Sequence, residues 1–450
     1  MVQLSFLGIL ALASAVAGLP GSPTPGSPSY PVPGTQPKDA VTLDVVPIGA
    51  SFEFFMYPSY MTNISLAAPC IEQFDNVFKR KMHVRIGGTT QDRAKYDPYF
   101  DGYVSYNVKD PLEAPMSLIY GPRFFDLIMY EFWKYPVATS PWNETQEGLD
   151  AANWAQDFIN HWNEPLPILA AGGYAIPFAI EPSWPNLPYL VDVAYNQTIK
   201  DGTKVYNGHL YSLSNVTADG LNVEMNHRTT VADLNTLPIS SSKLDNKPYI
   251  LGETGFHGAD YKMDATLGSA IQTVDKTLRG LSIGIQRMFY HQGTINQAFF
   301  NWWSSDSVNA PFYGAYFAAL AVEGGYSILA SDNGTDSFAQ YVVYKKEKPF
   351  KVVLVNTEYY SGTGSRSATK FTLTGLENGP VQTLRLTGPS SETSVSRLQS
   401  DPSLEPSIGG QYFSNDNCSL RGHKKFEKFT VQDYQLTITL SASEALIIYL

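Results

Sequence analysis

The chain has 450 residues, which is long enough for two or three domains. Hydrophobic residues make up 43% of the chain and charged residues only 16%, a composition that suits a large buried core and argues against disorder of the whole chain. Acidic residues (42) outnumber basic ones (31), and the net charge of −11 leaves no basic surplus for a nucleic-acid binder.

Residues 1–17 are predicted to be a secretory signal peptide. The apolar run Leu4–Ala17 ends in the small residues that signal cleavage requires, and it is too short to span a bilayer. Residues 18–40 are rich in Pro, Gly and Ser and offer little apolar surface to bury, so they are expected to form a linker. The sequence therefore predicts a secreted, extracellular protein without a membrane-spanning segment.

Six Asn-x-Ser/Thr sequons are typical of a glycoprotein of the secretory pathway; they begin at Asn63, Asn143, Asn196, Asn215, Asn333 and Asn417. The two cysteines, Cys70 and Cys418, could form a disulfide in that compartment or remain two separate buried thiols, and the sequence leaves both open. The seven histidines are scattered without metal-ligand spacing, so neither a metal nor another cofactor is predicted.

Residues 41–325 alternate strand-like and helix-like segments. Val41–Val45 and Ala50–Phe54 have the period of strands, and they either open this domain or join a C-terminal sheet. Further predicted strands are Val84–Gly88, Ile176–Ile180, Tyr206–Tyr211, Pro248–Glu253 and Gln286–His291, and predicted helices are 124–132, 149–162, Leu267–Leu281 and Phe312–Val322. Such alternation predicts an α/β barrel or a doubly wound sheet.

Residues 326–450 lack helical periodicity. Short apolar runs separated by turn residues such as Asn378-Gly379 predict a C-terminal antiparallel β-sandwich. The expected fold class is thus α/β followed by all-β.

Glu253 is the clearest candidate for chemistry. It ends a buried strand between Gly252 and Gly255, and a carboxylate at the C-terminal end of a barrel strand points into the usual active-site mouth. In retaining glycosidases such a carboxylate attacks the anomeric carbon. The pattern Gly280-Leu281-Ser282-Ile283-Gly284 looks like a serine-hydrolase elbow, but here a helix precedes the serine and a strand follows it, which is the reverse of what the elbow needs.

Six segments resemble, in the same order, motifs of glycoside hydrolase family 79, which contains β-glucuronidases and heparanases. The resemblance runs from about residue 42 to the C-terminus. The segments are Val84–Arg93, Gly121–Phe125, His209–Ser212, Gly252–Thr254, Gly280–His291 and Arg385–Ser390.

The resemblance implies a (β/α)8 barrel, complete or incomplete, with an attached β-sandwich and a retaining mechanism. Glu253 would be the nucleophile, and His209 and Tyr211 would line the sugar subsite. Arg85 and Asp92 would brace the mouth of the barrel and contribute to substrate binding. A glucuronide carboxylate would need donors such as tyrosine hydroxyls or backbone N–H groups.

The acid/base of the family is the Glu of an Asn-Glu-Pro motif that ends the fourth barrel strand, and this chain lacks a matching strand. Asn163-Glu164-Pro165 has the right residues but follows a helical stretch, so Pro165 could simply end that helix. Glu144 and Glu131 are weaker candidates. The remaining hypothesis is that several tens of residues are missing between about Leu127 and Trp142.

The sequence therefore predicts a secreted, monomeric retaining glycosidase acting on a β-glucuronide-containing oligosaccharide or glycoconjugate. Two alternatives stay open. One is an inactive glycan-binding glycoprotein that lacks the acid/base segment, and the other is a barrel glycosidase for neutral β-glycosides.

Overall fold

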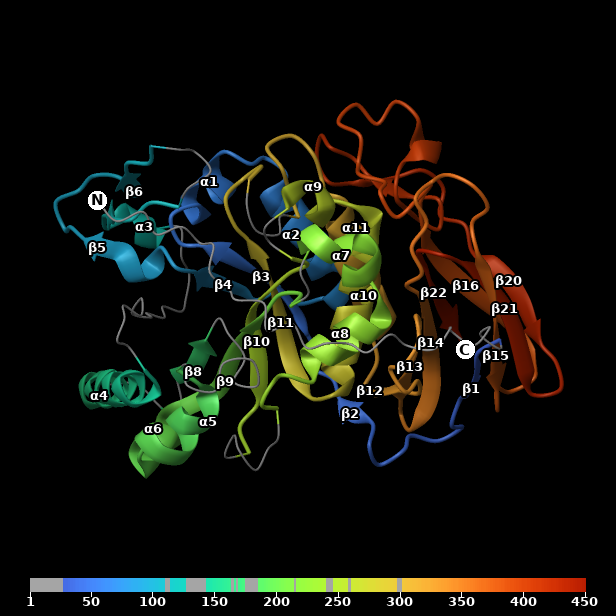
Figure 1. The fold of residues 1–450 in the computed structure, drawn as a ribbon, viewed down its shortest axis with the longest axis horizontal. Helices are drawn as coiled ribbons and strands as arrows, with labels where there is room; N and C mark the ends of the chain where they lie inside the picture. Colours follow the sequence, from blue (N-terminus) through green and yellow to red (C-terminus); the bar gives the residue numbers. More distant parts are fainter. Residues whose placement is uncertain are drawn as a thin grey trace.

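The computed structural model describes residues 27–109, 114–126, 143–162, 166, 169–174, 185–213, 216–239, 246–257, 260–297 and 302–450. At its centre lies a six-stranded sheet in which every neighbouring pair is parallel (Figure 1). Its order is β4-β3-β11-β10-β9-β8. The strands are β3 (Ile48–Glu53), β4 (Val84–Gly87), β8 (Leu169–Tyr174), β9 (Thr203–Leu210), β10 (Tyr249–Thr254) and β11 (Ile285–Gln292). The earliest of these strands, β3, pairs with the last, β11, as the first and last strands of a closed barrel do.

The barrel is incomplete over the described residues. A (β/α)8 barrel would place two further strands between β4 and β8, yet no described strand pairs with the outer edge of either one. The intervening chain instead forms a small sheet of β5 (Ala94–Tyr96), β7 (Leu118–Tyr120) and β6 (Val104–Tyr106). The predicted strand Ile176–Ile180 lies outside the described residues.

Strand β8 was not anticipated from the sequence. Its Gly172 and Gly173 interrupt the apolar pattern, and both have positive φ, at +89° and +94°. The helical elements of the described chain are α1 (Tyr57–Thr62), α2 (Ala67–Phe78), η1 (Gln91–Arg93), α3 (Arg123–Asp126), α4 (Glu144–His161), α5 (Leu187–Tyr189), η2 (Leu190–Ala194), α6 (Gln197–Gly202), α7 (Val216–Glu224), α8 (His227–Leu234), α9 (Tyr261–Asp264), α10 (Leu267–Ser282), α11 (Ala310–Val322) and η3 (Pro402–Leu404).

The C-terminal part is a β-sandwich, so the predicted combination of an α/β sheet and an all-β domain is confirmed. One sheet has the order β17-β16-β22-β14-β13-β12-β2, with β20 beside β16, and the other has the order β1-β15-β21. The C-terminal strands are β12 (Ser327–Ala330), β13 (Phe338–Lys345), β14 (Lys348–Asn356), β15 (Ala368–Thr374), β16 (Gly379–Thr387), β17 (Ser407–Ile408), β18 (Tyr412–Phe413), β19 (Leu420–Arg421), β20 (Glu427–Val431), β21 (Gln435–Ser441) and β22 (Glu444–Tyr449).

The expected linker at residues 18–40 is partly a strand of this sandwich. Residues Ser29–Pro31 form β1, which pairs in parallel with β15, and Tyr30 and Val32 are buried in the sandwich core. Pro31 is tolerated because β1 lies at the edge of its sheet, where a missing N–H costs little. Strand β2 (Val41–Thr42) also joins the sandwich, through β12, whereas β3 belongs to the parallel sheet.

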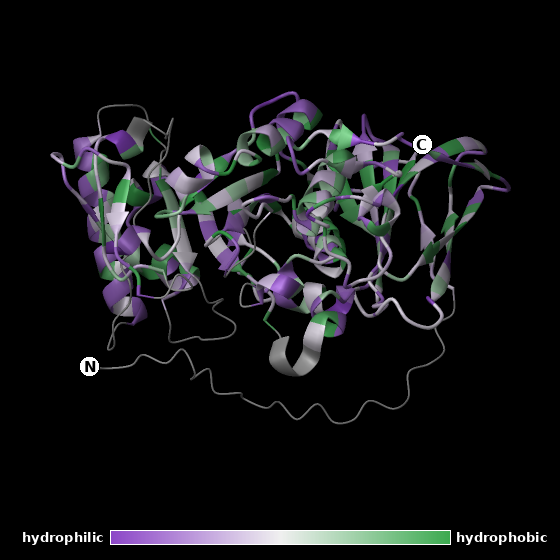
Figure 2. Cartoon of the chain, turned by 90° about the horizontal axis from the view of Figure 1, so that it is seen from above, coloured by the Kyte–Doolittle hydropathy of each residue, from purple (hydrophilic) through white to green (hydrophobic). Residues whose placement is uncertain are grey.

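Helices α10 and α11 pack together between the parallel sheet and the sandwich. Nearly all of α10 is buried, including the polar residues Gln272, Asp275 and Lys276. In Figure 2 the hydrophobic residues gather in these central helices and in the strands, while the peripheral loops are mostly hydrophilic. Among the helices of the described chain, none combines the length and the apolar character that crossing a bilayer requires.

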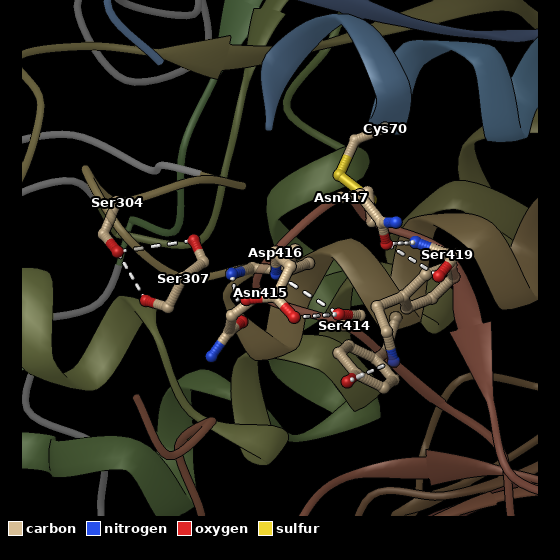
Figure 3. Close-up of a disulfide and its surroundings, with 12 residues drawn as sticks. Cys70, Ser304, Ser307, Ser414, Asn415, Asp416, Asn417 and Ser419 are labelled. Atoms are coloured by element: carbon tan, nitrogen blue, oxygen red, sulfur yellow. Dashed lines mark hydrogen bonds between the residues drawn. A yellow bond between two sulfur atoms is a disulfide. The ribbon is translucent and has the colours of Figure 1, made fainter. Parts of the chain in front are cut away.

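A disulfide joins the two parts of the molecule. Cys70 on α2 is bonded to Cys418 in the C-terminal domain, their Cα atoms are 5.2 Å apart, and both residues are fully buried. Figure 3 shows the bond beside the exposed Asn417, whose side-chain oxygen accepts hydrogen bonds from the backbone N–H and the hydroxyl of Ser419.

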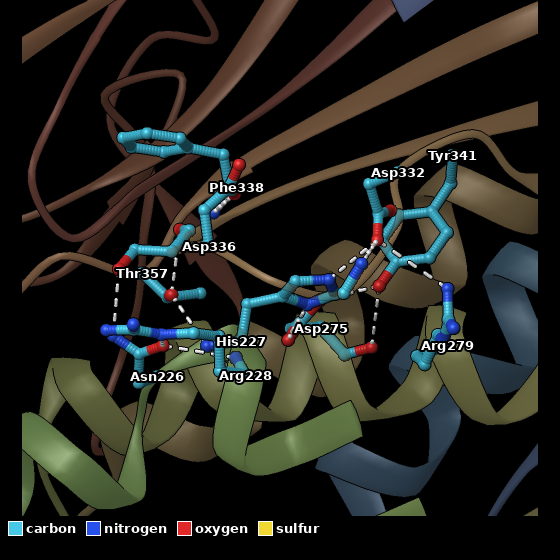
Figure 4. Close-up of polar contacts among 12 residues, drawn as sticks. Asn226, His227, Arg228, Asp275, Arg279, Asp332, Asp336, Phe338, Tyr341 and Thr357 are labelled. Atoms are coloured by element: carbon cyan, nitrogen blue, oxygen red, sulfur yellow. Dashed lines mark hydrogen bonds and ion pairs between the residues drawn. The ribbon is translucent and has the colours of Figure 1, made fainter. Parts of the chain in front are cut away.

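A buried polar cluster joins the same two parts at another point (Figure 4). The imidazole of His227 on α8 lies 2.8 Å from Asp275 of α10 and 2.8 Å from Asp332, which follows β12. The hydroxyl of Tyr341 on β13 donates to Asp275 at 2.6 Å. Burial disfavours the imidazolium, but the two carboxylates outweigh burial and raise the pKa of His227 to about 10.

Candidate active site

Glu253 lies one residue before the C-terminal end of β10, as the sequence predicted. Strand β10 is buried apart from the half-buried Ile250, and it pairs with β9 on one side and β11 on the other. The side-chain oxygen of Asn207 on β9 accepts the backbone N–H of Gly252 at 2.7 Å. A side chain at position 252 would overlap Asn207, which explains the glycine before the candidate nucleophile.

Two donors hold the Glu253 carboxylate in place. The Tyr211 hydroxyl donates to Oε1 at 3.0 Å, and Nη1 of Arg85 donates to Oε2 at 2.9 Å. Glu253 is only 9% exposed, so both contacts act in a poorly solvated setting. Tyr211 and Arg85 come from chain positions 42 and 168 residues away, and the parallel sheet brings them together.

The carboxylate of Glu253 is held in its ionised form. Burial alone would raise its pKa, but the facing imidazole of His291, the Arg85 guanidinium and the Tyr211 hydrogen bond outweigh burial and keep the pKa of Glu253 well below its usual range. An ionised, oriented carboxylate is what nucleophilic attack on an anomeric carbon requires.

His209 stands beside Glu253 as a neutral imidazole. Its Nδ1 is 3.8 Å from Oε2 of Glu253, and burial lowers the pKa of His209 to about 3. Its Nε2 is buried and has no hydrogen-bond partner among the described residues.

Three further residues surround Glu253, and the sequence did not single them out. His291 at the end of β11 places Nδ1 3.7 Å from Glu253 Oε2 and 3.2 Å from the Ser51 hydroxyl, and its Nε2 is 3.2 Å from Glu53. Ser51 in turn accepts from Arg85 at 2.8 Å. Glu53 and His291 each stand at the C-terminal end of a strand, the same signal that identified Glu253, and that signal could have found them.

Side chains of α10 donate hydrogen bonds to the loops that follow β9 and β10. The buried Lys276 ammonium donates to the carbonyl of Gly255 at 2.7 Å, and the Gln272 amide donates to the Ser212 hydroxyl at 2.9 Å. The backbone N–H of Ser212 donates to the carbonyl of Phe256 at 2.8 Å, which links the two loops. Tyr211 and Glu253 are therefore carried by backbone with little freedom to move.

Other candidate residues are less informative. Asp92 lies in the short helix η1 (Gln91–Arg93) after β4. Glu144 is in the first turn of α4 and accepts from Asn186 at 3.0 Å. Glu164, Glu131 and the sequon residue Asn215 lie outside the described residues, as does the predicted signal peptide. The other sequon residues, Asn63, Asn143, Asn196, Asn333 and Asn417, are all exposed.

Comparisons with known proteins point to one family. Residues 340–447 match the glycosyl hydrolase family 79 C-terminal beta domain. A β-glucuronidase of Aspergillus niger is 23% identical, with 84% of each chain covered, and one of Neurospora crassa is 24% identical, with 71% of this chain and 73% of the relative covered. The crystal structure of a 4-O-α-L-rhamnosyl-β-D-glucuronidase from Fusarium oxysporum 12S superposes with a TM-score of 0.83 at 27% identity, covering 94% of this chain and 100% of the other.

The Aspergillus alignment also contains residues that this chain lacks. It extends over 465 positions although it uses only 84% of a 450-residue chain. Several tens of residues of the relative therefore have no counterpart here.

Proposed function

Because the chain carries the C-terminal beta domain of glycoside hydrolase family 79 and shares its fold, we propose that it hydrolyses β-glucuronides with retention of configuration. The observation that carries the proposal is the ionised Glu253 carboxylate, held at the mouth of the parallel sheet by Arg85 and Tyr211. The β-glucuronidases among the relatives support the choice of glucuronides over neutral β-glycosides.

In the proposed reaction, Glu253 attacks the anomeric carbon while the bond from that carbon to the glycosidic oxygen breaks, so a covalent glycosyl-enzyme forms and the aglycone leaves with a proton from the acid/base carboxyl. Water then attacks the same carbon, the bond to Glu253 breaks, and the sugar is released. Arg85 and Tyr211 orient the carboxylate for attack and stabilise it again when water releases the sugar. His209 offers its unpartnered Nε2 to a sugar hydroxyl. The sugar carboxylate is received by neutral donors, since the Arg85 guanidinium, the cation that contacts Glu253, is already shared between Glu253 and Ser51.

The acid/base carboxyl is the open part of this proposal. A retaining enzyme needs a second carboxyl ~5 Å from the nucleophile. The described sheet lacks the two strands between β4 and β8, and a family acid/base would end the second of them. We propose that a segment carrying this group is absent from the chain as written, which agrees with the unmatched residues of the Aspergillus relative. Sequencing the transcript tests this, because a continuous read identical to the chain would refute it.

The same gap favours a second candidate function, an inactive protein that binds glucuronides without turnover. The deciding experiment compares the chain with Glu253→Gln on an aryl β-glucuronide whose leaving group is a weak base. Such a leaving group departs with little acid assistance, so the assay tests the nucleophile by itself. We expect cleavage by the wild type and loss of at least about 1000-fold in the variant. Binding without cleavage by a folded wild-type sample would favour the second candidate.

We also propose that the protein is secreted and glycosylated. Disulfides are typical of proteins in oxidising compartments, which supports secretion, and the exposed sequon residues are accessible to glycosylation. Expression in a eukaryotic host, followed by a mass comparison before and after enzymatic deglycosylation of the medium fraction, tests both parts.

A further inference from the structure

Lys276 is a buried ammonium that the proposed reaction does not use. It lies on α10 with no exposed surface, and its Nζ donates to the carbonyl of Gly255 at 2.7 Å. Burial lowers the pKa of this ammonium to about 8, against the opposing effect of three carboxylates, those of Asp233, Glu224 and Asp264. The side chain is therefore a cation at neutral pH, placed where the chain leaves β10.

Two of these carboxylates also hold the backbone of the loops at the active site. Asp264 on α9 accepts the backbone N–H of His257 at 3.2 Å, in the loop that follows β10. Asp233 on α8 accepts the backbone N–H of Leu213 at 3.2 Å, in the loop that follows β9. Both carboxylates are buried. The lysine cluster, which we define as Lys276, Asp233 and Asp264, thus contacts the backbone beyond both strands.

The contacted backbone groups are close in the chain to the candidate nucleophile and its donor. Gly255 follows Glu253 by two residues, and Leu213 follows Tyr211 by two residues. The Tyr211 hydroxyl donates to the Glu253 carboxylate at 3.0 Å. A shift of one loop relative to the other would therefore change the contact that orients the nucleophile.

We propose that Lys276 is a positioning residue that, with Asp233 and Asp264, fixes both loops so that Tyr211 stays aligned with the Glu253 carboxylate. Lys276 acts through the backbone and not through the sugar, because its side chain is fully buried and its ammonium is bonded to a carbonyl. A cation suits this place better than a neutral donor, since it also offsets two buried carboxylates. This inference rests on the proposed function, because it concerns the nucleophile of the same site.

The test compares Lys276→Met, which keeps a long side chain but removes the charge and the donor, with the matched control Lys351→Met. Lys351 on β14 is likewise a buried lysine that donates to backbone carbonyls, those of Leu320 and Glu323, both at 2.7 Å. These carbonyls belong to the C-terminal end of α11 and not to a loop beside Glu253. Melting temperatures identify any variant that fails to fold.

A second variant keeps the test decisive if Lys276→Met does not fold. The double variant Lys276→Met/Asp233→Asn replaces two buried opposite charges by neutral groups of similar size, which buried sites accept more readily than one uncompensated charge. The Asn oxygen can still accept the N–H of Leu213. This variant therefore lacks the Gly255 hydrogen bond without leaving Asp233 unpaired.

The kinetic assay is the first turnover of an activated aryl β-glucuronide, in which Glu253 displaces the aryloxide. We expect the folded Lys276 variant to lose about 10- to 100-fold in the first-turnover rate, because misplacement of a reacting group is costly, while the half-saturating concentration stays within about twofold. Lys351→Met should change both quantities by less than about twofold. A wild-type rate in the folded Lys276 variant, an equal loss in the control, or a loss confined to the half-saturating concentration would overturn the proposal.

Backbone hydrogen exchange separates this inference from the proposed function, because it does not depend on catalysis. Peptides covering 208–213 and 252–257 should exchange at least about 10-fold faster in the Lys276 variant than in the wild type, and at the wild-type rate in Lys351→Met. If the wild type cleaves no glucuronide, the proposed function falls, and faster exchange confined to the Lys276 variant would still support its hold on the two loops. Unchanged exchange in both peptides would overturn the inference whether or not the wild type is active.

Discussion

Removal of the Cys70–Cys418 disulfide should destabilise the protein strongly, because the bond closes a loop between residues 348 positions apart. The chain-entropy relation for a loop of this length gives about 6 kcal/mol at 25 °C as an upper bound, whereas measured disulfides typically contribute about 2–4 kcal/mol. At about 2.1 cal/mol/K of unfolding entropy per residue, 450 residues give about 0.9 kcal/mol per °C, so the double variant Cys70→Ala/Cys418→Ala should melt about 2–4 °C below the wild type.

The assay is a fluorescence melt at one scan rate, with and without reductant, because unfolding of a multidomain chain need not be two-state. Reductant should lower the wild-type midpoint toward that of the double variant and leave the double variant itself unchanged. A midpoint that shifts by less than 1 °C in both comparisons would refute the reasoning, since the disulfide would then constrain the unfolded chain very little.

Three other substitutions test the contacts described above. Tyr211→Phe removes a hydrogen bond to the ionised form of Glu253, which should raise the pKa of that carboxyl. The acid limb of the pH profile of kcat/KM should therefore move upward by about one pH unit, and activity should fall about 10-fold. An acid limb that does not move would contradict this role. The His227→Gln variant should be less stable than the wild type. Protonated His227 stabilises the wild type fully below about pH 6.5, and this contribution is lost as the pH rises through about 10, so the melting temperatures of the two proteins should converge at high pH. A difference in melting temperature that stays constant from pH 6 to 10.5 would count against the raised pKa. Gly88→Ala should lower activity and stability together, because φ is +89° there and a Cβ would overlap the Glu53 carboxylate; wild-type kinetics and melting in this variant would show that the loop adapts.

The sequence predicted the candidate nucleophile for a physical reason, whereas Tyr211 and Arg85 were expected only from the resemblance to glycoside hydrolase family 79. Glu253 and Tyr211 lie at or just beyond the C-terminal ends of β10 and β9, and such positions converge at one edge of a parallel sheet. The strand–helix alternation and the later run of short strands were enough to predict both halves of the fold.

What the sequence could not supply are contacts that depend on which strands pair. Ser51 and His291 are 240 residues apart and meet because β3 lies beside β11. Strand β1 in the predicted linker was missed because a proline-rich segment shows no alternation of apolar and polar residues. A proline is nevertheless tolerated in a strand at the edge of a sheet.

The pairing of β1 with β15 has a consequence for biosynthesis. Tyr30 lies opposite Leu373, so a strand made near the start of translation must wait for its partner until about 340 further residues have been added. At ~5–20 residues per second this delay is tens of seconds, during which the segment stays unpaired. The sandwich can form only at the end of synthesis, and shortening the chain at its N-terminus beyond residue 28 would damage the last domain to fold rather than the first.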